Sequence, residues 1–215
     1  MKKRITIIFL SFSVLLSCGD NFHNSSDIFL AEEQDKPVIG KRIILPAMEA
    51  YYNGAIKNID FKAYKNKWII LFFYPGDFTF VCPTELKELA DYYDDFKAGG
   101  AEVFSISTDS AHVHKAWKKD SIYLKDVKFP MLSDRSGLLS RIMGVYEPQK
   151  GSAIRASFIL NPERIVVSAE YSDDSVGRNV GELLRKFDAA LAVRKGGGGM
   201  CPAGWTQGDT LITEE

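Results

Sequence analysis

The most regular hydrophobic segment of the chain is residues 68–74, seven consecutive apolar or aromatic residues that end at Pro75-Gly76. A continuous run of this length, bounded by turn residues, is typical of a strand that is buried on both faces of a mainly parallel sheet. After a short loop, apolar residues recur at helical spacing from Pro83 to Lys97, and Gly99-Gly100 follow. Because proline favours the first turn of a helix and glycine the position after its end, the pattern predicts strand, loop and helix in that order.

A second strand and helix follow along the chain. Residues 103–107 have the composition of a strand, and residues 111–119 have amphipathic helical spacing after Asp109 or Ser110, either of which can cap the helix. Together with the first unit, this order predicts a βαβ arrangement. The remaining predictions are a strand at 129–132, a helix at 138–143, an antiparallel pair of strands at 157–160 and 165–171 joined by a turn at Asn161-Pro162, and a long helix at 176–193.

Short strands are also predicted near the start of the folded part of the chain. Apolar alternation predicts one strand at Ile43 to Leu45, and Asn53-Gly54 predicts a tight hairpin turn between two strands. Gly196 to Gly199 end all regular structure, and the residues after them have no hydrophobic pattern of their own. We therefore expect one domain at residues 37–195 and a C-terminal arm at residues 196–215.

The N-terminal segment has the pattern of an export signal. Lys2, Lys3 and Arg4 precede an apolar run at residues 5–16, which is too short to span a bilayer as a helix. The run ends in Leu15-Leu16-Ser17-Cys18, which resembles the lipobox of bacterial lipoproteins. The alternative is an ordinary cleaved signal in which Cys18 is incidental. We expect a signal peptide at residues 1–17, lipidation at Cys18 and a polar tether at residues 18–36.

These features predict the location of the protein. We expect an exported, membrane-anchored lipoprotein that faces the periplasm or the cell exterior, with the N-terminal lipid as its only contact with the membrane.

Composition and charge narrow the function classes. The chain has 215 residues, of which 46% are hydrophobic and 26% charged, and this excludes collagen-like, coiled-coil and disordered proteins. Lys and Arg number 27 against 28 Asp and Glu. Without residues 1–17, which carry three basic and no acidic side chains, the net charge is 24 − 28 = −4. No basic surface is available for nucleic acid, so a small substrate is expected.

Two cysteines remain after Cys18 is set aside. Cys82 lies at the start of the predicted helix, where unpaired backbone N–H groups and the helix dipole favour a thiolate. Cys201 lies just beyond four glycines, in a segment that is able to move. The two cysteines are candidates for a redox pair. Two alternatives stay open on spacing alone: both are inert buried residues, or they form a permanent structural disulfide.

The residues around Cys82 carry a specific motif. The segment Pro75-Gly76-Asp77-Phe78-Thr79-Phe80-Val81-Cys82-Pro83-Thr84-Glu85 resembles the active-site loop of the peroxiredoxins. The resemblance extends over residues 37–209 and is strongest to the typical two-cysteine group, which includes alkyl hydroperoxide reductase C subunits and thioredoxin peroxidases. It implies an α/β thioredoxin-like fold, with a central mixed β-sheet flanked by helices, an N-terminal hairpin and a mobile C-terminal arm.

The resemblance also implies a catalytic role for several residues. Cys82 attacks the distal oxygen of a peroxide and becomes a sulfenic acid. The hydroxyl of Thr79 hydrogen-bonds the thiolate and the peroxide, Arg155 stabilises the thiolate and the transition-state oxygens, and Pro75 shields the site. Glu85 and Arg178 orient Arg155 or the loop.

The same resemblance implies the remaining steps and partners. Cys201 of the partner subunit condenses with the sulfenic acid to give an intersubunit disulfide, so a homodimer is required, and rings of five dimers are common in the relatives. The loop around Phe78 and Phe80 lies near the contacts of such a decamer. The substrates are hydrogen peroxide and organic hydroperoxides. A thioredoxin-like or flavoprotein-linked dithiol donor restores the thiols, and no bound cofactor is needed.

Alternatives to a peroxidase remain on the same scaffold. An exported protein without a reductant is able to act as a redox-regulated holdase chaperone or as a peroxide sensor. A thiol-disulfide oxidoreductase is discounted, because Cys82 has no second cysteine in a Cys-x-x-Cys pair. His112 and His114 have no third ligand nearby, so surface or interface positions are expected for them and no metal site is predicted.

Overall fold

The computed structural model describes residues 38–213. The chain divides into two units, residues 1–36 and residues 37–215. The expected signal peptide, the lipidation site at Cys18 and the polar tether therefore lie outside the described residues. Within the described part of the second unit, no helix has the length and apolarity needed to cross a membrane.

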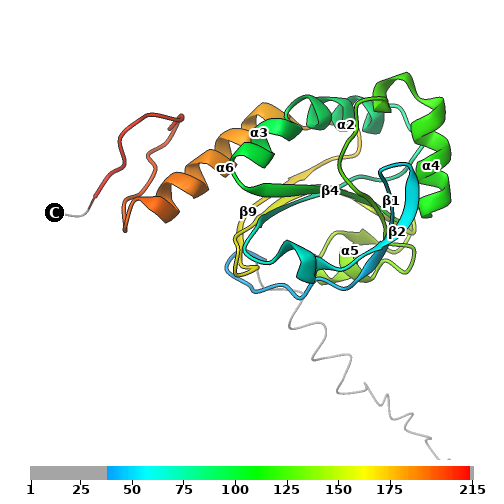
Figure 1. Ribbon diagram of the computed structural model, residues 1–215, viewed down its shortest axis with the longest axis horizontal. Coiled ribbons are helices and arrows are strands. Elements are labelled where there is room, and N and C mark those ends of the chain that lie inside the picture. Colours follow the sequence, from blue (N-terminus) through cyan, green and yellow to red (C-terminus); the bar gives the residue numbers. More distant parts are fainter. Residues whose placement is uncertain (1–37, 214–215) are drawn as a thin grey trace, which may run out of the picture. The chain divides into compact units, whose positions relative to one another are not determined.

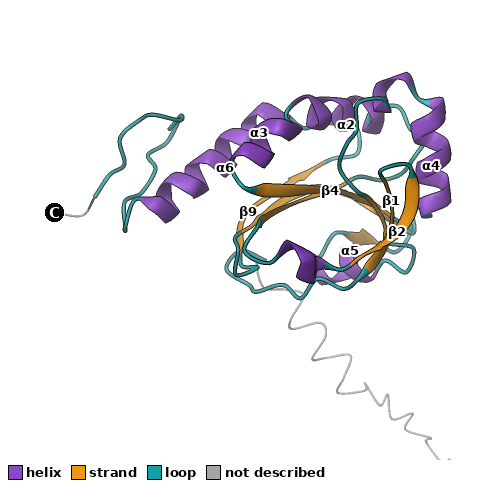
Figure 2. Ribbon diagram, in the orientation of Figure 1, coloured by secondary structure: helices purple, strands orange, loops and turns teal. Residues whose placement is uncertain are grey.

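The described residues form a seven-stranded mixed sheet (Figure 2). Its strand order is β2-β1-β5-β4-β3-β8-β9. The three central strands β5, β4 and β3 run parallel to one another, and every other neighbouring pair is antiparallel. The strands are β1 (Met48–Tyr52), β2 (Ala55–Ile59), β3 (Trp68–Phe73), β4 (Ala101–Ser107), β5 (Met131–Ser133), β8 (Arg155–Leu160) and β9 (Val166–Ser172), and β6 (Tyr146–Glu147) and β7 (Ser152–Ala153) pair separately.

Helices cover both faces of the sheet (Figure 1). On one face lie α2, α3 and α6, and on the other lies α5. The helices are α2 (Cys82–Asp91), α3 (Tyr93–Ala98), α4 (Ala111–Asp120), α5 (Leu138–Ile142) and α6 (Val180–Lys195), with short 3-10 turns η1 (Phe61–Tyr64) and η2 (Ile122–Leu124). This layering supplies the two hydrophobic cores that the sheet separates.

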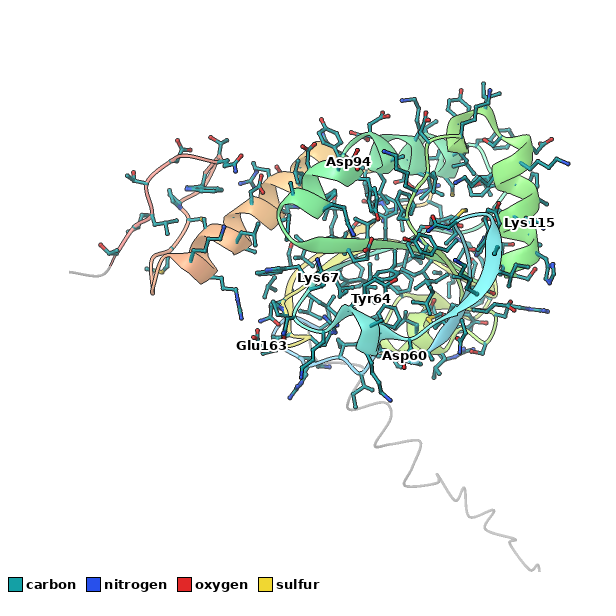
Figure 3. All side chains as sticks on the ribbon, in the orientation of Figure 1. Asp60, Tyr64, Lys67, Asp94, Lys115 and Glu163 are labelled. Atoms are coloured by element: carbon teal, nitrogen blue, oxygen red, sulfur yellow. The ribbon has the colours of Figure 1, made fainter. Side chains whose placement is uncertain are left out.

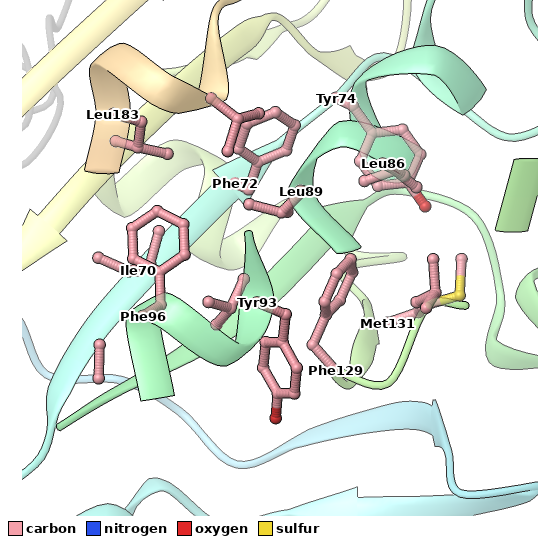
Figure 4. Packing of buried hydrophobic residues seen from close by; sticks show 14 of the residues in the cluster. Ile70, Phe72, Tyr74, Leu86, Leu89, Tyr93, Phe96, Phe129, Met131 and Leu183 are labelled. Carbon is pink, nitrogen blue, oxygen red and sulfur yellow. The ribbon is translucent and has the colours of Figure 1, made fainter. Parts of the chain in front are cut away.

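The long apolar run at residues 68–74 contains strand β3, which is buried on both faces of the sheet. Trp68, Ile70, Phe72 and Tyr74 pack into the core under α2, α3 and α6, and the alternating residues of β3 pack into the other core. Figure 4 shows Ile70, Phe72 and Tyr74 among the side chains of Leu86, Leu89 and Phe96. The prediction of a doubly buried strand is confirmed. The sheet is mixed rather than mainly parallel, because β8 pairs with β3 in the antiparallel sense.

The N-terminal hairpin is present as predicted, and the strand before it is not. Asn53 and Gly54 have φ angles of 51° and 77° and connect β1 to β2. Ile43 to Leu45 form no strand, so that prediction is wrong. The Ile43 N–H donates to the carbonyl of Arg164, a residue whose φ angle is 67°. Because the backbone turns at Arg164, the pairing is limited to a single bridge between Arg42 and Ile165. The Arg164 guanidinium ties this turn to the carbonyls of Lys67 and Tyr64. Figure 3 labels Tyr64 and Lys67 together with Glu163, the residue before Arg164.

Two predicted helices have different limits in the structure. The helix predicted at 83–97 is broken at Tyr92, which caps α2 and precedes α3. The helix predicted at 176–193 begins only at Val180, because the side chain of Asn179 accepts the N–H of Glu182 at 2.8 Å and caps α6 there. Helix α4 begins as predicted, and its cap is Ser110 rather than Asp109.

The C-terminal arm folds back on itself. The N–H of Met200 donates to the carbonyl of Ile212 at 2.7 Å, and the reverse bond is 2.8 Å. The guanidinium of Arg185 on α6 donates to the carbonyl of Trp205 at 2.7 Å, and the indole is 4% exposed. The arm is therefore held by α6 at defined points, and its described residues 196–213 contain an isolated bridge and no extended strand.

Candidate active site

Cys82 is the first residue of α2, which follows the loop that leaves the central strand β3. Its side chain is fully buried. No side chain caps this helix end: the N–H groups of Thr84 and Glu85 bond to the carbonyl of Val81. The sulfur therefore lies at the positive end of the helix dipole, in a site that excludes water.

Arg155 reaches this sulfur from β8. Its Nη1 lies 3.3 Å from Cys82 Sγ and 2.7 Å from Glu85 Oε2. Nε and Nη2 donate to the carbonyl of Asp174 at 3.0 and 2.9 Å. Because the guanidinium is fixed by these other partners, its remaining donor is held in direct contact with the cysteine.

Glu85 and Arg178 complete the cluster. Arg178 donates to Glu85 through Nε at 2.9 Å, through Nη2 at 3.0 Å and through its backbone N–H at 2.9 Å. It also bonds the carbonyl of Ala156, and its guanidinium stacks 3.5 Å from the centre of the Phe72 ring. Glu85 thus bridges both arginines, and the expected orienting role of Glu85 and Arg178 has the necessary contacts.

The charges in this cluster favour an anion at Cys82. The side chains of Arg155, Arg178 and Glu85 are all nearly completely buried. In direct contact, two guanidinium cations face one carboxylate, which leaves one surplus positive charge in a water-poor site. A thiolate at Cys82 compensates that charge, whereas a neutral thiol does not.

The pKa shifts of the cluster follow from the same contacts. Burial alone would raise the pKa of Glu85, but hydrogen bonds and charge from Arg178, with the charge of Arg155, hold it below its ordinary value. Burial alone would lower the pKa of Arg155, but its contacts with Cys82 and Glu85 raise it. Burial is the largest effect at Arg178, whose pKa is lowered.

Acid should destabilise the protein through Glu85. Because the folded-state pKa of this carboxyl is lowered, its contribution to stability is complete above its ordinary pKa of about 4.5 and is lost as the pH falls through the lowered pKa. Glu85→Gln should remove about 3–5 kcal/mol at neutral pH, since it leaves two buried arginines without a carboxylate. The variant should also lose less stability than the wild type in acid. Urea unfolding measured across the acidic range tests both statements.

A surface carboxylate supplies the control for this prediction. Glu163 pairs with Arg194 at the surface, where both side chains are exposed. Glu163→Gln should keep the urea midpoint and the acid sensitivity of the wild type. Equal effects of the two substitutions would contradict the role given to the buried carboxylate.

Pro75 and Thr79 lie in the loop between β3 and α2. Pro75 is half-buried directly after the strand. Thr79 is exposed, and its hydroxyl donates to the carbonyl of Gly76 at 2.9 Å. Among the described hydrogen bonds of residues 38–213, none joins Thr79 to Cys82. The expected bonds of Thr79 to the thiolate and the peroxide therefore stay predictions.

Cys201 lies away from Cys82 in this chain. Both cysteines are free thiols, and Cys201 Sγ contacts the carbonyl of Ala189 on α6 at 3.5 Å. The alternative of a permanent disulfide between the two cysteines of one chain does not hold. Cys201 lines a pocket of about 550 Å³ between α6, β9 and the arm, with mainly apolar walls that include Trp68, Val167, Ala189, Val193 and Pro202.

The position of one of the two histidines on α4 differs from the one predicted from the sequence. His112 is exposed, but His114 is fully buried, so the expectation of a surface or interface position is wrong for His114. Its spacing of three residues from both Ala111 and Trp117, which are buried, was the available signal. Within residues 38–213 no group of three or more His, Cys, Asp or Glu side chains is arranged to hold a metal. The carbonyl of Asp174, a partner of Arg155, had no signal in the sequence.

Known proteins resemble this chain over most of its length. The model of the AhpC/TSA family matches residues 41–169. Alkyl hydroperoxide reductase C from Salmonella typhimurium is 38% identical over 164 residues, which are 76% of this chain and 88% of that protein. The protein of the same name from Bacillus subtilis is 36% identical over 176 residues, which are 82% and 94% of the two chains.

Solved structures agree with these relatives. The crystal structure of Enterococcus faecalis AhpC is 40% identical with a TM-score of 0.75, and the match covers 78% of this chain and 100% of that one. The reduced 2-Cys peroxiredoxin of Plasmodium vivax is 30% identical with a TM-score of 0.77, covering 82% and 93%. The mixed sheet flanked by helices is therefore a thioredoxin-like fold, as expected.

Proposed function

Because this chain belongs to the AhpC/TSA family and is a peroxiredoxin enzyme, we propose that it reduces hydrogen peroxide and organic hydroperoxides at Cys82 and forms a disulfide between subunits through Cys201. The observation that carries this proposal is the contact between Cys82 Sγ and Arg155 Nη1 at 3.3 Å inside a buried cluster with surplus positive charge.

The first step is an attack by sulfur on oxygen. The thiolate of Cys82 forms an S–O bond with one peroxide oxygen, and the O–O bond breaks. The other oxygen leaves with its substituent and takes up a proton, giving water or an alcohol. Cys82 is oxidised to a sulfenic acid and the peroxide is reduced. Arg155 supplies fixed N–H donors for the negative charge that moves along the O–O bond.

The second step uses the other cysteine. The thiol of Cys201 of the partner subunit attacks the sulfur of the sulfenic acid, the S–S bond forms, and the oxygen leaves as water. A dithiol donor of the thioredoxin type, or one linked to a flavoprotein, then reduces this disulfide by exchange and is itself oxidised. Because Cys82 is buried in the first turn of α2, that turn must unwind before the disulfide forms.

A homodimer follows from this mechanism. Cys201 contacts its own α6 rather than its own Cys82. An exposed edge is available for association at β9, where the side chains of Val167 and Tyr171 are 38% and 50% exposed. Phe78 and Phe80 are 57% and 97% exposed beside the active site and would lie at contacts between dimers in a decamer.

Export is a separate part of the proposal and rests on the sequence alone. Residues 1–17 direct export, Cys18 receives the lipid, and residues 18–36 link the anchor to the enzyme. An oxidising compartment favours the disulfide, so turnover there needs a donor that is delivered across the membrane. Radiolabelled fatty acid incorporated by the wild type and absent from Cys18→Ala would support the anchor, and equal labelling of both would contradict it.

Turnover of the full chain tests the enzymatic proposal. Hydrogen peroxide should be consumed continuously when a thioredoxin-type donor is in excess. After peroxide without donor, a non-reducing gel should show a dimer band that reductant removes. If Cys82 reacts once and no donor restores it, a sensor or holdase chaperone becomes the better function. If no peroxide is consumed even in the first turnover, the assignment to Cys82 fails.

A further inference from the structure

The carbonyl group that orients Arg155 lies in a short connection between β9 and α6, residues 173–179. Arg155 Nε and Nη2 both donate to the carbonyl oxygen of Asp174, at 3.0 and 2.9 Å. The N–H that faces Cys82 is on the remaining nitrogen, Nη1. Because the guanidinium is planar and rigid, a shift of this carbonyl turns the whole group and moves the donor away from the sulfur. The position of the Asp174 backbone therefore matters to the reaction.

The backbone at Asp174 forms a tight turn. The side chain of Asp173 accepts the N–H of Ser175 at 2.9 Å and its hydroxyl at 2.6 Å. The carbonyl of Asp173 accepts the N–H of Val176 at 3.0 Å. This is an Asx turn closed by a main-chain bond. These bonds fix the shape of the turn, but they do not fix where the turn lies relative to Arg155.

A lysine from a different part of the chain holds this turn in place. Lys150 Nζ lies 2.7 Å from Asp174 Oδ2 and 3.0 Å from Glu147 Oε2. Lys150 belongs to the connection between β6 and β7, where the N–H of Gly151 donates to the carbonyl of Glu147 at 2.9 Å. The hydroxyl of Thr108, directly after β4, donates to the carbonyl of Gly151 at 3.1 Å. Lys150 thus joins the turn at Asp174 to a segment that is attached to the central sheet.

The other end of the connection contacts the start of α2. The backbone N–H of Arg178 donates to Glu85 Oε1 at 2.9 Å. A Cβ atom added to Gly177 would lie 3.3 Å from Val81 Cγ1, so the backbone packs closely against the residue before Cys82. The connection is therefore held by the buried cluster at one end and by Lys150 at the other, and the Asp174 carbonyl lies between these two attachments.

The charges around the turn show what Lys150 contributes. Hydrogen bonds to Asp174 and Glu147 raise the pKa of Lys150, so its ammonium group stays charged. Hydrogen bonds from Ser175 lower the pKa of Asp173, and the charges of Lys150 and Arg155 lower it further. Without the ammonium group, the carboxylates of Asp174 and Glu147 repel each other. The turn would then move away from the connection between β6 and β7.

We propose that Lys150 is a positioning residue for the oxidation of Cys82, because its ion pair with Asp174 holds the carbonyl that orients Arg155. This inference rests on the proposed function. When the ion pair is lost, the turn at Asp174 shifts, the guanidinium follows it, and the attack on peroxide slows. The side chains of Lys150 and Asp174 are 53% and 37% exposed, so the effect is modest and is screened by salt.

Three lysine variants test this role. Lys150→Met removes the charge, keeps a long side chain and should slow the first oxidation of Cys82 about 2- to 5-fold at low salt. Lys150→Arg keeps the charge and should restore most of the rate. Lys87→Met is the matched control, because Lys87 also pairs with an aspartate at 2.7 Å and its side chain is 50% exposed. It should match the wild type.

A double-mutant cycle tests the ion pair itself. Asp174→Asn removes the carboxylate and keeps the backbone carbonyl that Arg155 uses. If Lys150 acts through Asp174, the double variant should oxidise no more slowly than Lys150→Met alone. If the two single effects multiply in the double variant, the two residues act independently and the inference is wrong.

The measurement is the rate of Cys82 oxidation by hydrogen peroxide in the full chain, followed by stopped flow at fixed pH from about 10 mM to about 1 M salt. Hydrogen peroxide is uncharged, so salt does not alter its electrostatic attraction to the site. The ratio of the wild-type rate to the Lys150→Met rate should fall toward 1 as salt rises.

Four results of this measurement have a definite meaning. A ratio that stays constant with salt would overturn the inference, as would a Lys150→Arg rate equal to that of Lys150→Met. Equal slowing in Lys87→Met would assign the effect to net charge, which also overturns it. A wild type that does not react at all contradicts the proposed function instead.

Hydrogen exchange gives a second readout that does not depend on peroxide. The peptide from Asp173 to Arg178 should exchange its amide hydrogens faster in Lys150→Met than in the wild type or in Lys87→Met, while peptides of β8 stay protected. Equal exchange of this peptide in all three proteins would contradict the proposed attachment. Faster exchange in β8 as well would assign Lys150 a role in global stability, which also overturns the inference.

Discussion

Cys82→Ser is expected to abolish peroxide reduction, leaving only the uncatalysed background. Serine is nearly isosteric, but its hydroxyl is not ionised beside Arg155 and is a poor nucleophile toward oxygen. The fold should be retained, because the residue is small and makes its only described side-chain hydrogen bond to that arginine. Peroxide consumption with an excess of dithiol donor and the thermal unfolding midpoint are the two measurements. Full activity in this variant would remove Cys82 from the reaction.

Cys201→Ser is the matched control for this result. Its Cys82 should still react with one equivalent of peroxide per chain, because Cys201 contacts Ala189 and lies outside the buried cluster. Turnover with a thioredoxin-type donor should then stop, and the dimer band on a non-reducing gel should be missing. A dimer band that persists in Cys201→Ser would contradict the proposed disulfide. If Cys201→Ser did not reduce even one equivalent of peroxide, Cys201 would have a role in the attack itself.

Arg155→Leu should slow the first oxidation of Cys82 on the order of 10²–10³-fold, the usual cost of removing a fixed donor at a site where negative charge develops. The substitution removes the N–H that faces the sulfur at 3.3 Å, whereas Glu85 keeps its bonds to Arg178. The buried cluster then loses its surplus positive charge, so a thiolate is no longer favoured. Single-turnover rates measured over a range of peroxide concentrations test this prediction.

Two further arginine variants make the prediction specific. Arg194→Leu removes an exposed arginine that pairs with Glu163, and it should leave the rate unchanged. Arg155→Lys keeps the charge but loses the forked set of donors that reaches the sulfur, Glu85 and the Asp174 carbonyl together. It should fall between Arg155→Leu and the wild type. A rate in Arg155→Lys equal to that of Arg155→Leu would mean that donor geometry, rather than charge, controls the reaction.

The parts of the fold that follow from local patterns were predictable. The run at residues 68–74 contains β3 (Trp68–Phe73), and Asn53-Gly54 is the hairpin turn, because each signal depends only on neighbouring residues. The break at Tyr92 had no such signal, since Tyr93 and Phe96 continue the helical spacing and stay buried. The start of α6 carried a signal in Asn179, a capping residue, but the apolar spacing extended the predicted helix past it.

In the candidate active site, too, features that depend on neighbouring residues were predictable from the sequence, and contacts between distant residues were not. Cys82 was indicated by its position at a helix start, whereas its contact with Arg155 spans 73 residues and was expected only from the resemblance. The burial of His114 depends on Asp77, which lies 37 residues earlier in the chain. When the sequence shows no nearby partner for a histidine, a surface position is the usual prediction. Polar residues in a core are therefore hard to predict, because what permits their burial is a distant group that satisfies them.

The length of the glycine segment sets a geometric limit on the dimer. Helix α6 ends at Lys195, and Cys201 follows after 201 − 195 = 6 residues. Six fully extended residues span at most about 22 Å. Once the Met200–Ile212 and Arg185–Trp205 hydrogen bonds open, the proposed disulfide requires the Cα atom of the partner subunit's Cys82 to come within about 28 Å of the end of α6, because a disulfide adds about 6 Å between its two Cα atoms. A dimer with a longer separation leaves the two sulfurs out of reach of each other, however mobile the arm becomes.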